Sequence, residues 1–173
     1  MIRLLPVRMR LLAVATGMLM LASCGYHLVG HGGGTGAIPA DVHTLTVSGN
    51  ADASVMSALR QRLGSDQYQL VEGMAVADQA HHALLHITIA PLVFVPSAYD
   101  ATGIATQFHM IFSGSLMIEQ DGKTVWQTGT ISRDGDLFVS GGPASIDASR
   151  SRLLSDLQKQ WVSDAIGRIR SGF

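Results

Sequence analysis

The feature that most constrains the fold is a long segment of alternating apolar and polar residues, 107–119. One face of this segment carries Phe108, Met110, Phe112, Leu116 and Ile118, and the other mostly carries Gln107, His109, Ser113, Ser115 and Glu119. A period of two over more than ten residues predicts a β-strand with one buried face and one face that is wet or partnered. The Asp121-Gly122 pair that follows predicts a tight hairpin into the next strand, Val125–Ile131.

The chain before this segment predicts two short strands separated by a helix. The first strand is indicated by the alternation of His43, Leu45 and Val47 with Thr44, Thr46 and Ser48. Asn50 or Asp52 can cap a helix that ends at Gly64. The apolar positions of this helix recur every four residues, at Val55, Leu59 and Leu63, with Met56 beside them. Tyr68–Val71 is then expected as a short second strand.

Two further regions complete the sheet. The β-branched run Ala83–Val95 predicts a long strand, in which Pro91 indicates an edge position or a bulge. Residues 96–104 are turn-rich. A loop is expected after the last strand, because Asp134-Gly135-Asp136 and Gly141-Gly142-Pro143 are both rich in turn-forming residues.

The C-terminal region predicts a long amphipathic helix, from about Ile146 to Arg170. Its apolar stripe comprises Leu153, Leu157, Trp161, Ala165 and Ile169, widened by Leu154, Val162 and Ile166. Ser145 is the expected N-cap, and Asp147 is well placed against the helix dipole. The element order predicts an α+β two-layer sandwich, with two helices packed on one face of a mainly antiparallel four- to five-stranded sheet.

The N-terminal segment has the pattern of a bacterial lipoprotein signal peptide. Met1–Arg10 carries three arginines and no acid, and Leu11–Leu21 is almost purely apolar but too short to span a membrane. Leu21-Ala22-Ser23-Cys24-Gly25 is a lipobox, in which the thiol of Cys24 accepts the lipid. Cys24 is the only cysteine of the chain, and several acyl chains anchor a protein durably. Gly25 is not the aspartate typical of inner-membrane retention, so a lipid-anchored protein of the cell outer membrane is expected.

Cleavage changes the charge balance and sets the domain organisation. Residues 1–23 take three of the twelve Lys and Arg residues and none of the thirteen Asp and Glu residues, which leaves a net charge of −4. A mildly acidic protein is a poor bulk partner for nucleic acid. We expect a signal peptide at 1–23, a lipidated N-terminus and glycine-rich tether at 24–39, and a single domain at 40–173, with no disulfide available to hold it.

Three motifs for other chemistry are weak. Gly32-x-Gly34-x-x-Ala37 loosely matches a dinucleotide fingerprint, but it lacks the preceding strand and following helix that the motif needs. His81, His82 and His86 cluster with a metal-like spacing, yet they lie where a strand begins, so residues i and i+4 are far apart. Ser113-Gly114-Ser115 lies within a strand and is not a nucleophile elbow. We therefore expect no cofactor, no metal site and no enzymatic activity.

The start Cys24-Gly25-Tyr26-His27-Leu28, the short glycine tether, the element order and the final amphipathic helix together resemble the LptE family of lipopolysaccharide-assembly lipoproteins. The resemblance covers essentially the whole mature chain, through the order and spacing of short motifs. It implies a plug inside the outer-membrane β-barrel LptD, forming a heterodimer that delivers lipopolysaccharide to the outer leaflet without covalent chemistry.

The resemblance also implies direct lipopolysaccharide contact through basic residues, because phosphate groups favour arginine. Arg133, Arg150 and Arg152 are the candidates, expected to meet the 96–104 loop at one end of the sheet. That loop holds Asp100 and no cation, which departs from family members that carry a basic residue there. The alternative is a stand-alone periplasm-facing lipoprotein that binds a small ligand or another envelope protein.

Overall fold

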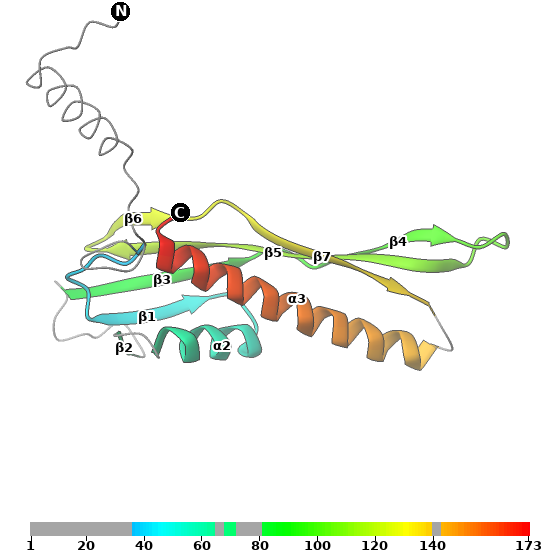
Figure 1. Ribbon diagram of the computed structural model, residues 1–173, viewed down its shortest axis with the longest axis horizontal. Helices are drawn as coiled ribbons and strands as arrows, with labels where there is room; N and C mark the ends of the chain where they lie inside the picture. Colours follow the sequence, from blue (N-terminus) through cyan, green and yellow to red (C-terminus); the bar gives the residue numbers. More distant parts are fainter. Residues whose placement is uncertain (1–35, 65–67, 72–80, 140–142) are drawn as a thin grey trace, which may run out of the picture. The chain divides into compact units, whose positions relative to one another are not determined.

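The computed structural model describes residues 36–64, 68–71, 81–139 and 143–173, and these residues form an α+β fold, as predicted (Figure 1). The elements in chain order are β1 (Thr44–Gly49), α2 (Ala53–Gly64), β2 (Gln69–Leu70), β3 (His82–Ile89), β4 (Val93–Tyr99), β5 (Ala105–Gln120), β6 (Lys123–Gln127), β7 (Ile131–Phe138) and α3 (Pro143–Ser171). Cys24 and most of the expected tether lie outside the described residues.

The sheet is organised around β5, the long alternating strand. Strands β3 and β4 pair antiparallel with successive parts of one edge of β5, and β6 and β7 pair antiparallel with successive parts of its other edge. Strand β1 pairs parallel with both β2 and β3. Among the described residues the sheet is thus mixed and has seven strands. These are more than the mainly antiparallel four or five that we predicted, because single predicted strands are divided in the structure.

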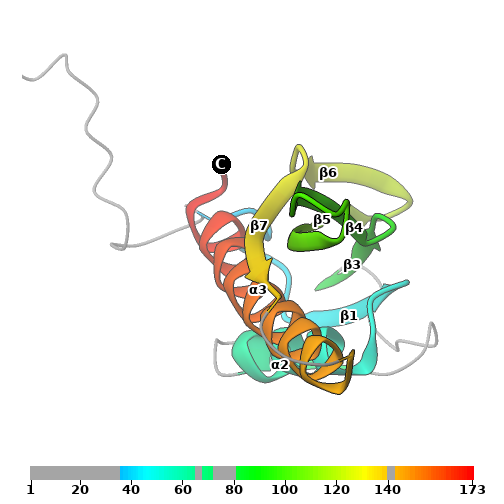
Figure 2. The ribbon, with the colours of Figure 1, turned by 90° about the vertical axis from the view of Figure 1, so that its right-hand side faces the viewer.

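One face of this sheet is covered by the helices, as predicted. Helix α3 contacts β5 and β7 over much of its length and packs against α2 (Figure 2). The largest fully buried side chains of the core are Trp161, Leu45, Leu59, Leu63, Leu85, Ile87, Met110, Leu116, Ile118, Ile131 and Leu157. The alternating residues of β5 and the apolar stripe of α3 therefore meet in one core, which is why both patterns were readable in the sequence.

The N-termini of the two helices test the predicted N-caps. Asp52 caps α2 as predicted, because its carboxylate accepts a hydrogen bond from the Val55 backbone N–H at 2.9 Å. The prediction that Ser145 caps α3 is wrong, because the helix already begins at Pro143. Proline suits the first turn of a helix, where its missing N–H would have no intrahelical partner.

The Asp121-Gly122 hairpin is confirmed. Asp121 and Gly122 have φ values of 53° and 71°, and two successive positive φ values are what a two-residue turn of type I′ requires. The strand predicted to follow at Val125–Ile131 is instead two strands, since β6 ends at Gln127 and β7 begins at Ile131.

Two other boundaries differ from prediction for identifiable reasons. The run Ala83–Val95 is divided into β3 and β4, with Pro91 between them, because proline cannot donate a backbone hydrogen bond. Strand β4 continues to Tyr99, so the turn-rich segment is shorter than expected.

Asp134-Gly135-Asp136 is not a loop but the middle of β7. A Cβ on Gly135 would lie 2.9 Å from a methyl group of Leu153, so glycine allows α3 to approach this strand closely.

Candidate functional site

The face of the sheet opposite the helices is the first candidate interaction surface, and we call it the open face. It comprises the alternate residues that point away from the core on β1, β3, β5 and β7: Thr44, Thr46, Ser48, His82, Leu84, His86, Thr88, Gln107, His109, Ile111, Ser113, Ser115, Met117, Glu119, Ser132, Asp134, Asp136 and Phe138. Acids, histidines and hydroxyls dominate, and none of these described residues is Lys or Arg. The open face is therefore polar and carries acidic charge, in agreement with the wet or partnered face predicted for β5.

His109 links two aspartates across the open face. Its Nδ1 lies 2.9 Å from an Asp136 carboxylate oxygen, and its Nε2 lies 4.0 Å from an Asp134 carboxylate oxygen. Both aspartates come from β7 and His109 comes from β5, so this cluster exists only because the Asp-Gly-Asp segment is a strand. Sequence reasoning missed the cluster for that reason, although the i, i+2 spacing of the aspartates was a signal of strand alternation.

A second polar line on this face joins Ser48, His86 and Glu119. The Ser48 hydroxyl lies 3.1 Å from Nδ1 of His86, and the Nε2 of the same ring lies 3.7 Å from a Glu119 carboxylate oxygen. The residue types are those of a hydrolase relay, in which a base activates a nucleophile and an acid orients the base. Here the three side chains stand on three neighbouring strands of a sheet face, and the imidazole and carboxylate are each about one-third exposed.

The histidines that cluster in sequence separate in space. The Nε2 of His82 lies 2.9 Å from the Thr46 hydroxyl on the open face, whereas His81 stacks against His43 with ring centroids 5.6 Å apart. His81 lies just before β3 and His82 begins it, and neighbouring side chains of an extended chain turn to opposite faces. Within the described ranges no group of three or more His, Cys, Asp or Glu side chains is arranged to hold a metal ion.

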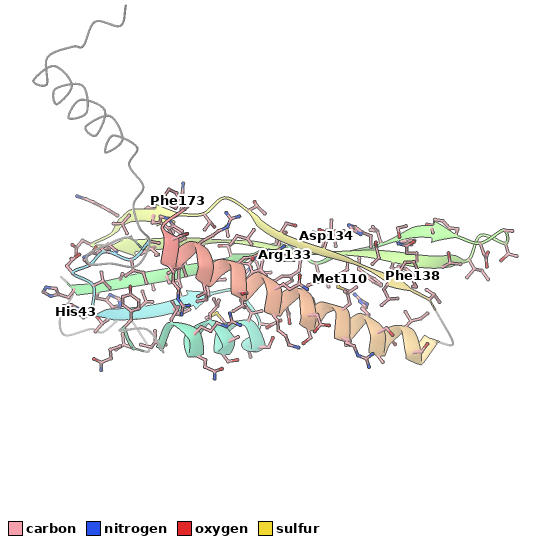
Figure 3. The ribbon with its side chains drawn as sticks, viewed as in Figure 1. His43, Met110, Arg133, Asp134, Phe138 and Phe173 are labelled. Carbon is pink, nitrogen blue, oxygen red and sulfur yellow. The ribbon has the colours of Figure 1, made fainter. Side chains whose placement is uncertain are left out.

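The three candidate arginines do not converge. Arg133 lies on the covered face of β7 and forms an ion pair with Asp164 of α3 through both Nε and a terminal nitrogen (Figure 3 labels Arg133). The Arg150 guanidinium lies 4.5 Å from the ring centroid of Phe94 on β4, and Arg152 is exposed. Residues 150 and 164 are about 21 Å apart along an ideal helix, so Arg150 and the Asp164 partner of Arg133 lie at separate places along α3.

The placement relative to the loop follows from the strand register. Arg133 is opposite Phe112, well along β5, whereas the turn before β5 is close to the other end of that strand. Phe94 is opposite Met110, nearer that turn. Phe94, which Arg150 contacts, lies at the start of β4, so neither Arg133 nor Arg150 is placed beside the turn between β4 and β5.

The end of the sheet formed by β4, the start of β5 and the end of β7 carries most of the exposed large apolar side chains. These are Leu92, Val93, Val95, Tyr99, Ile104 and Phe138, which we call the distal apolar surface. Phe138 is 70% exposed and Ile104 is 65% exposed. Strand β4 has β5 on one side and pairs with no other described strand. Sequence reasoning did not find this surface, because nothing in an apolar strand residue tells whether a helix covers it.

The turn between β4 and β5 is ordered by Asp100. Its carboxylate accepts hydrogen bonds from the Thr102 hydroxyl at 2.6 Å, the Thr102 N–H at 2.8 Å and the Ile104 N–H at 3.0 Å. The Thr102 side chain, followed by these backbone donors, lowers the pKa of Asp100. The carboxylate is thus occupied in holding the turn, which presents the neighbouring Tyr99 and Ile104 in a fixed arrangement.

The end of the expected tether packs against the C-terminal end of α3. The Ala37 N–H donates a hydrogen bond to the Ile169 carbonyl at 2.7 Å, which satisfies one of the carbonyls that a helix end leaves without an intrahelical partner. Ala37 and Ile38 are buried. Among the helices of the described residues, none is long and apolar enough to cross a membrane.

No protein-family model matches the sequence, and no curated protein matches it. The fold, in contrast, is similar to solved lipoproteins. Rare lipoprotein B from Shewanella oneidensis matches with a TM-score of 0.58 and 13% identity, over 72% of this chain and 92% of that one. An uncharacterized lipoprotein B from Nitrosomonas europaea matches with a TM-score of 0.56 and 14% identity, over 82% and 87% of the two chains.

A minor lipoprotein from Acinetobacter baumannii is similar to the same extent, with a TM-score of 0.56 and 11% identity over 75% of this chain and 91% of that one. In all three cases the similarity extends over most of the length of the solved chain. At these identities the likeness establishes the fold. The chain has the fold of these three solved lipoproteins.

Proposed function

We propose that this chain is a lipid-anchored lipoprotein of the outer membrane that acts as the plug and assembly partner of the LptD β-barrel, and so aids the insertion of lipopolysaccharide into the outer leaflet. The fold that it shares with rare lipoprotein B and two further lipoproteins supports a lipoprotein of this type. The lipobox at Cys24 supports the anchor. The proposal names the barrel because the start of the mature chain and its element order resemble the LptE family.

The open face is the observation that best supports a plug role. The interior of a large outer-membrane barrel is polar, and a body that fills it needs a polar surface that its own elements do not cover. The open face has this character: Asp134, Asp136 and Glu119 supply acidic charge, and hydroxyls and imidazoles surround them. The distal apolar surface adds side chains such as Phe138, whose exposure is costly in water and favours a protein contact.

Lipopolysaccharide contact is proposed for Arg150 and Arg152 in particular. Phosphorylated, acylated sugars need cations next to apolar surface, and Arg150 lies over Phe94, which stacks on Phe108 at 4.8 Å. Arg133 is a weaker candidate, because a phosphate would have to compete with its ion pair to Asp164. We further propose that the protein catalyses no covalent reaction, and that Ser48, His86 and Glu119 are surface hydrogen-bonding residues.

Co-purification of an untagged barrel with this chain tests the proposed plug role. The full chain, carrying an affinity tag at its C-terminus, is expected to recover a large β-barrel in non-denaturing detergent. Its depletion from cells is expected to reduce surface lipopolysaccharide. The matched variant for the contact is Val95→Ser with Phe138→Ser, which should lower barrel recovery without unfolding the body. Recovery of a monomer without any barrel would contradict the proposal and favour a stand-alone ligand-binding lipoprotein.

Binding of purified lipopolysaccharide tests the arginines. Arg150→Gln with Arg152→Gln is expected to weaken binding about tenfold or more, since each lost charge-assisted contact is worth about 1.5–3 kcal/mol. Lys159→Gln with Arg168→Gln removes the same charge from the same helix and serves as the control. An equal loss in both double variants would show that only net charge matters, and would remove the assignment of Arg150 and Arg152.

A further inference from the structure

Three segments that are far apart in the sequence meet at the C-terminal end of α3, and we call this region the anchor corner. It comprises residues 36–40, 123–127 and 165–173. The Ala37 N–H donates a hydrogen bond to the Ile169 carbonyl at 2.7 Å, and the Trp126 indole N–H donates one to the Gly172 carbonyl at 3.1 Å. The end of the expected tether, strand β6 and the last turn of α3 are therefore joined directly.

The anchor corner exposes apolar side chains. Phe173 is 89% exposed, and Val125 on β6 is 44% exposed; these are the two exposed large apolar side chains of the described residues that lie outside the distal apolar surface (Figure 3 labels Phe173). The helix end before Phe173 is held in place. The Gly172 N–H donates a hydrogen bond to the Arg168 carbonyl at 2.8 Å, and Gly172 has a φ of 77°, the left-handed cap with which many helices end.

Basic side chains accompany these apolar ones. Lys123 and Arg170 are exposed and Arg168 is half-buried, and the three segments contain no Asp or Glu. The acids that border the segments in the sequence are Asp41, Asp121 and Asp164. Asp164 forms an ion pair with Arg133. The expected mature chain has a net charge of −4, so a corner with three cations and no acid of its own is a local departure that suits an anionic partner.

The length of chain between Cys24 and the body indicates which partner this is. Twelve residue steps separate Cys24 from Gly36. A chain spans at most about 3.3–3.6 Å per residue, so a lipid on Cys24 lies within about 43 Å of Gly36. Helix α3 has 29 residues and is therefore about 44 Å long. The chain enters the body at the C-terminal end of α3, whereas the distal apolar surface lies toward the other end, so the anchor corner is the exposed apolar region nearest to the anchor along the chain.

We propose that the anchor corner binds the phospholipid surface of the membrane that holds the acyl chains. Lys123 and Arg170 contact anionic head groups, and Phe173 and Val125 enter the interfacial region. Aromatic side chains favour this depth, and basic residues are attracted to an anionic surface. An acyl anchor combined with basic residues also holds a protein more durably than one acyl chain alone. This inference rests on the lipid anchor of the proposed function, and it is independent of the barrel.

Vesicle binding by the mature chain without its lipid tests the anchor corner. The chain carries Cys24→Ser, so no acyl group contributes, and it is titrated with vesicles of equal parts phosphatidylglycerol and phosphatidylcholine. We expect binding at low salt that weakens at higher salt, because salt screens the charges. Lys123→Gln and Arg170→Gln should each weaken binding about fivefold. Phe173→Ser should weaken it by about fivefold or more, because an apolar side chain no longer leaves water.

Two control variants show which end of the body binds. Lys159→Gln removes one exposed positive charge from the middle of α3, and Phe138→Ser removes an exposed ring from the distal apolar surface. Both should leave vesicle binding within about twofold, and melting temperatures establish that every variant is folded. Loss of binding in Phe138→Ser with normal binding in Phe173→Ser would overturn the proposal. Equal losses in Lys159→Gln and Arg170→Gln, or absence of binding in the parent, would also overturn it.

The anchor itself is tested separately, in cells fed with radiolabelled palmitate. The parent should incorporate the label and Cys24→Ser should not. Label in the parent without vesicle binding would overturn the contact at the anchor corner and leave the anchor intact. Vesicle binding without label would overturn the anchor and leave the corner as a surface that binds phospholipid.

Discussion

The two ends of β5 differ in what covers them. Toward its C-terminal end, inward side chains such as Phe112 and Leu116 are buried against α3, and Trp161 of α3 contacts Phe112 edge-on with ring centroids 5.9 Å apart. Toward its N-terminal end, Phe108 is only half-buried, and six of the eight exposed large apolar side chains of the described residues lie on the strands and connections around it. The C-terminal end of β5 therefore contributes most of the stability, and the N-terminal end offers most of the surface for apolar contact.

The largest effect is expected from Trp161→Ala. Trp161 is fully buried, and its indole N–H donates a hydrogen bond to the Ile131 carbonyl at 3.1 Å. Its loss should lower the free energy of unfolding by about 3–5 kcal/mol. Phe138→Ala, at the other end, should change it by less than about 0.5 kcal/mol. Urea denaturation of the two variants measures the contrast, and similar losses in both would remove the distinction between the two ends.

A smaller but sharper contrast is expected between two glycines. A Cβ on Gly114 would lie 2.7 Å from the Thr88 carbonyl oxygen and 3.0 Å from a ring carbon of Trp161, whereas a Cβ on Gly129 would meet nothing within 4 Å. Gly114→Ala should therefore destabilise the protein by about 1–3 kcal/mol through overpacking. Gly129→Ala should be neutral or slightly stabilising. Denaturation midpoints check both, and a neutral Gly114→Ala would show that this contact is looser than the structure has it.

Asp52→Ala removes the N-cap of α2 and should lower the free energy of unfolding by about 1 kcal/mol. Burial raises the pKa of Asp52, but hydrogen bonds from Val55, Ser54 and Gln158 outweigh it, so the net pKa is lowered. A carboxyl with a lowered folded-state pKa contributes stability above its unfolded value, near 3.8, and this contribution is lost as the pH falls through the folded value. Denaturation between pH 2 and 6, with Asp52→Asn as the uncharged cap, should show a shallower acid loss in the variant. Identical pH profiles in the parent and in Asp52→Asn would show that Asp52 does not cause the loss of stability in acid.

The smallest effect is expected from Ser48→Ala on the open face. If Ser48 is a surface hydrogen-bonding residue, its loss should leave lipopolysaccharide delivery unchanged, with stability altered by about 1 kcal/mol or less. A surface-lipopolysaccharide assay on cells carrying the variant makes the comparison. A severe defect with normal protein level would instead support a chemical role for the line Ser48–His86–Glu119.

The contrast between two Asp-Gly pairs explains how much of the fold was predictable. Asp121-Gly122 forms the expected turn, because two positive φ values are a local requirement that the two residues satisfy by themselves. Asp134-Gly135 is a similar pair in sequence but lies within β7. There the missing side chain of Gly135 makes room for Leu153 of α3. Periodicity alone was sufficient for the core face of β5 and the stripe of α3. The partners of His109 and Arg133 depend on strand register, which no local pattern encodes.

Site-specific photo-crosslinking in living cells tests the central claim most directly, that the open face and the distal apolar surface contact a barrel. A photoreactive phenylalanine analogue is placed at Ser115 on the open face, at Phe138 on the distal apolar surface, and at the exposed Lys159 on α3 as a control. The account predicts a high-mass adduct containing an outer-membrane barrel from the first two positions, and a weaker one from Lys159. Adducts from Lys159 alone, or no barrel adduct from any position, would contradict it.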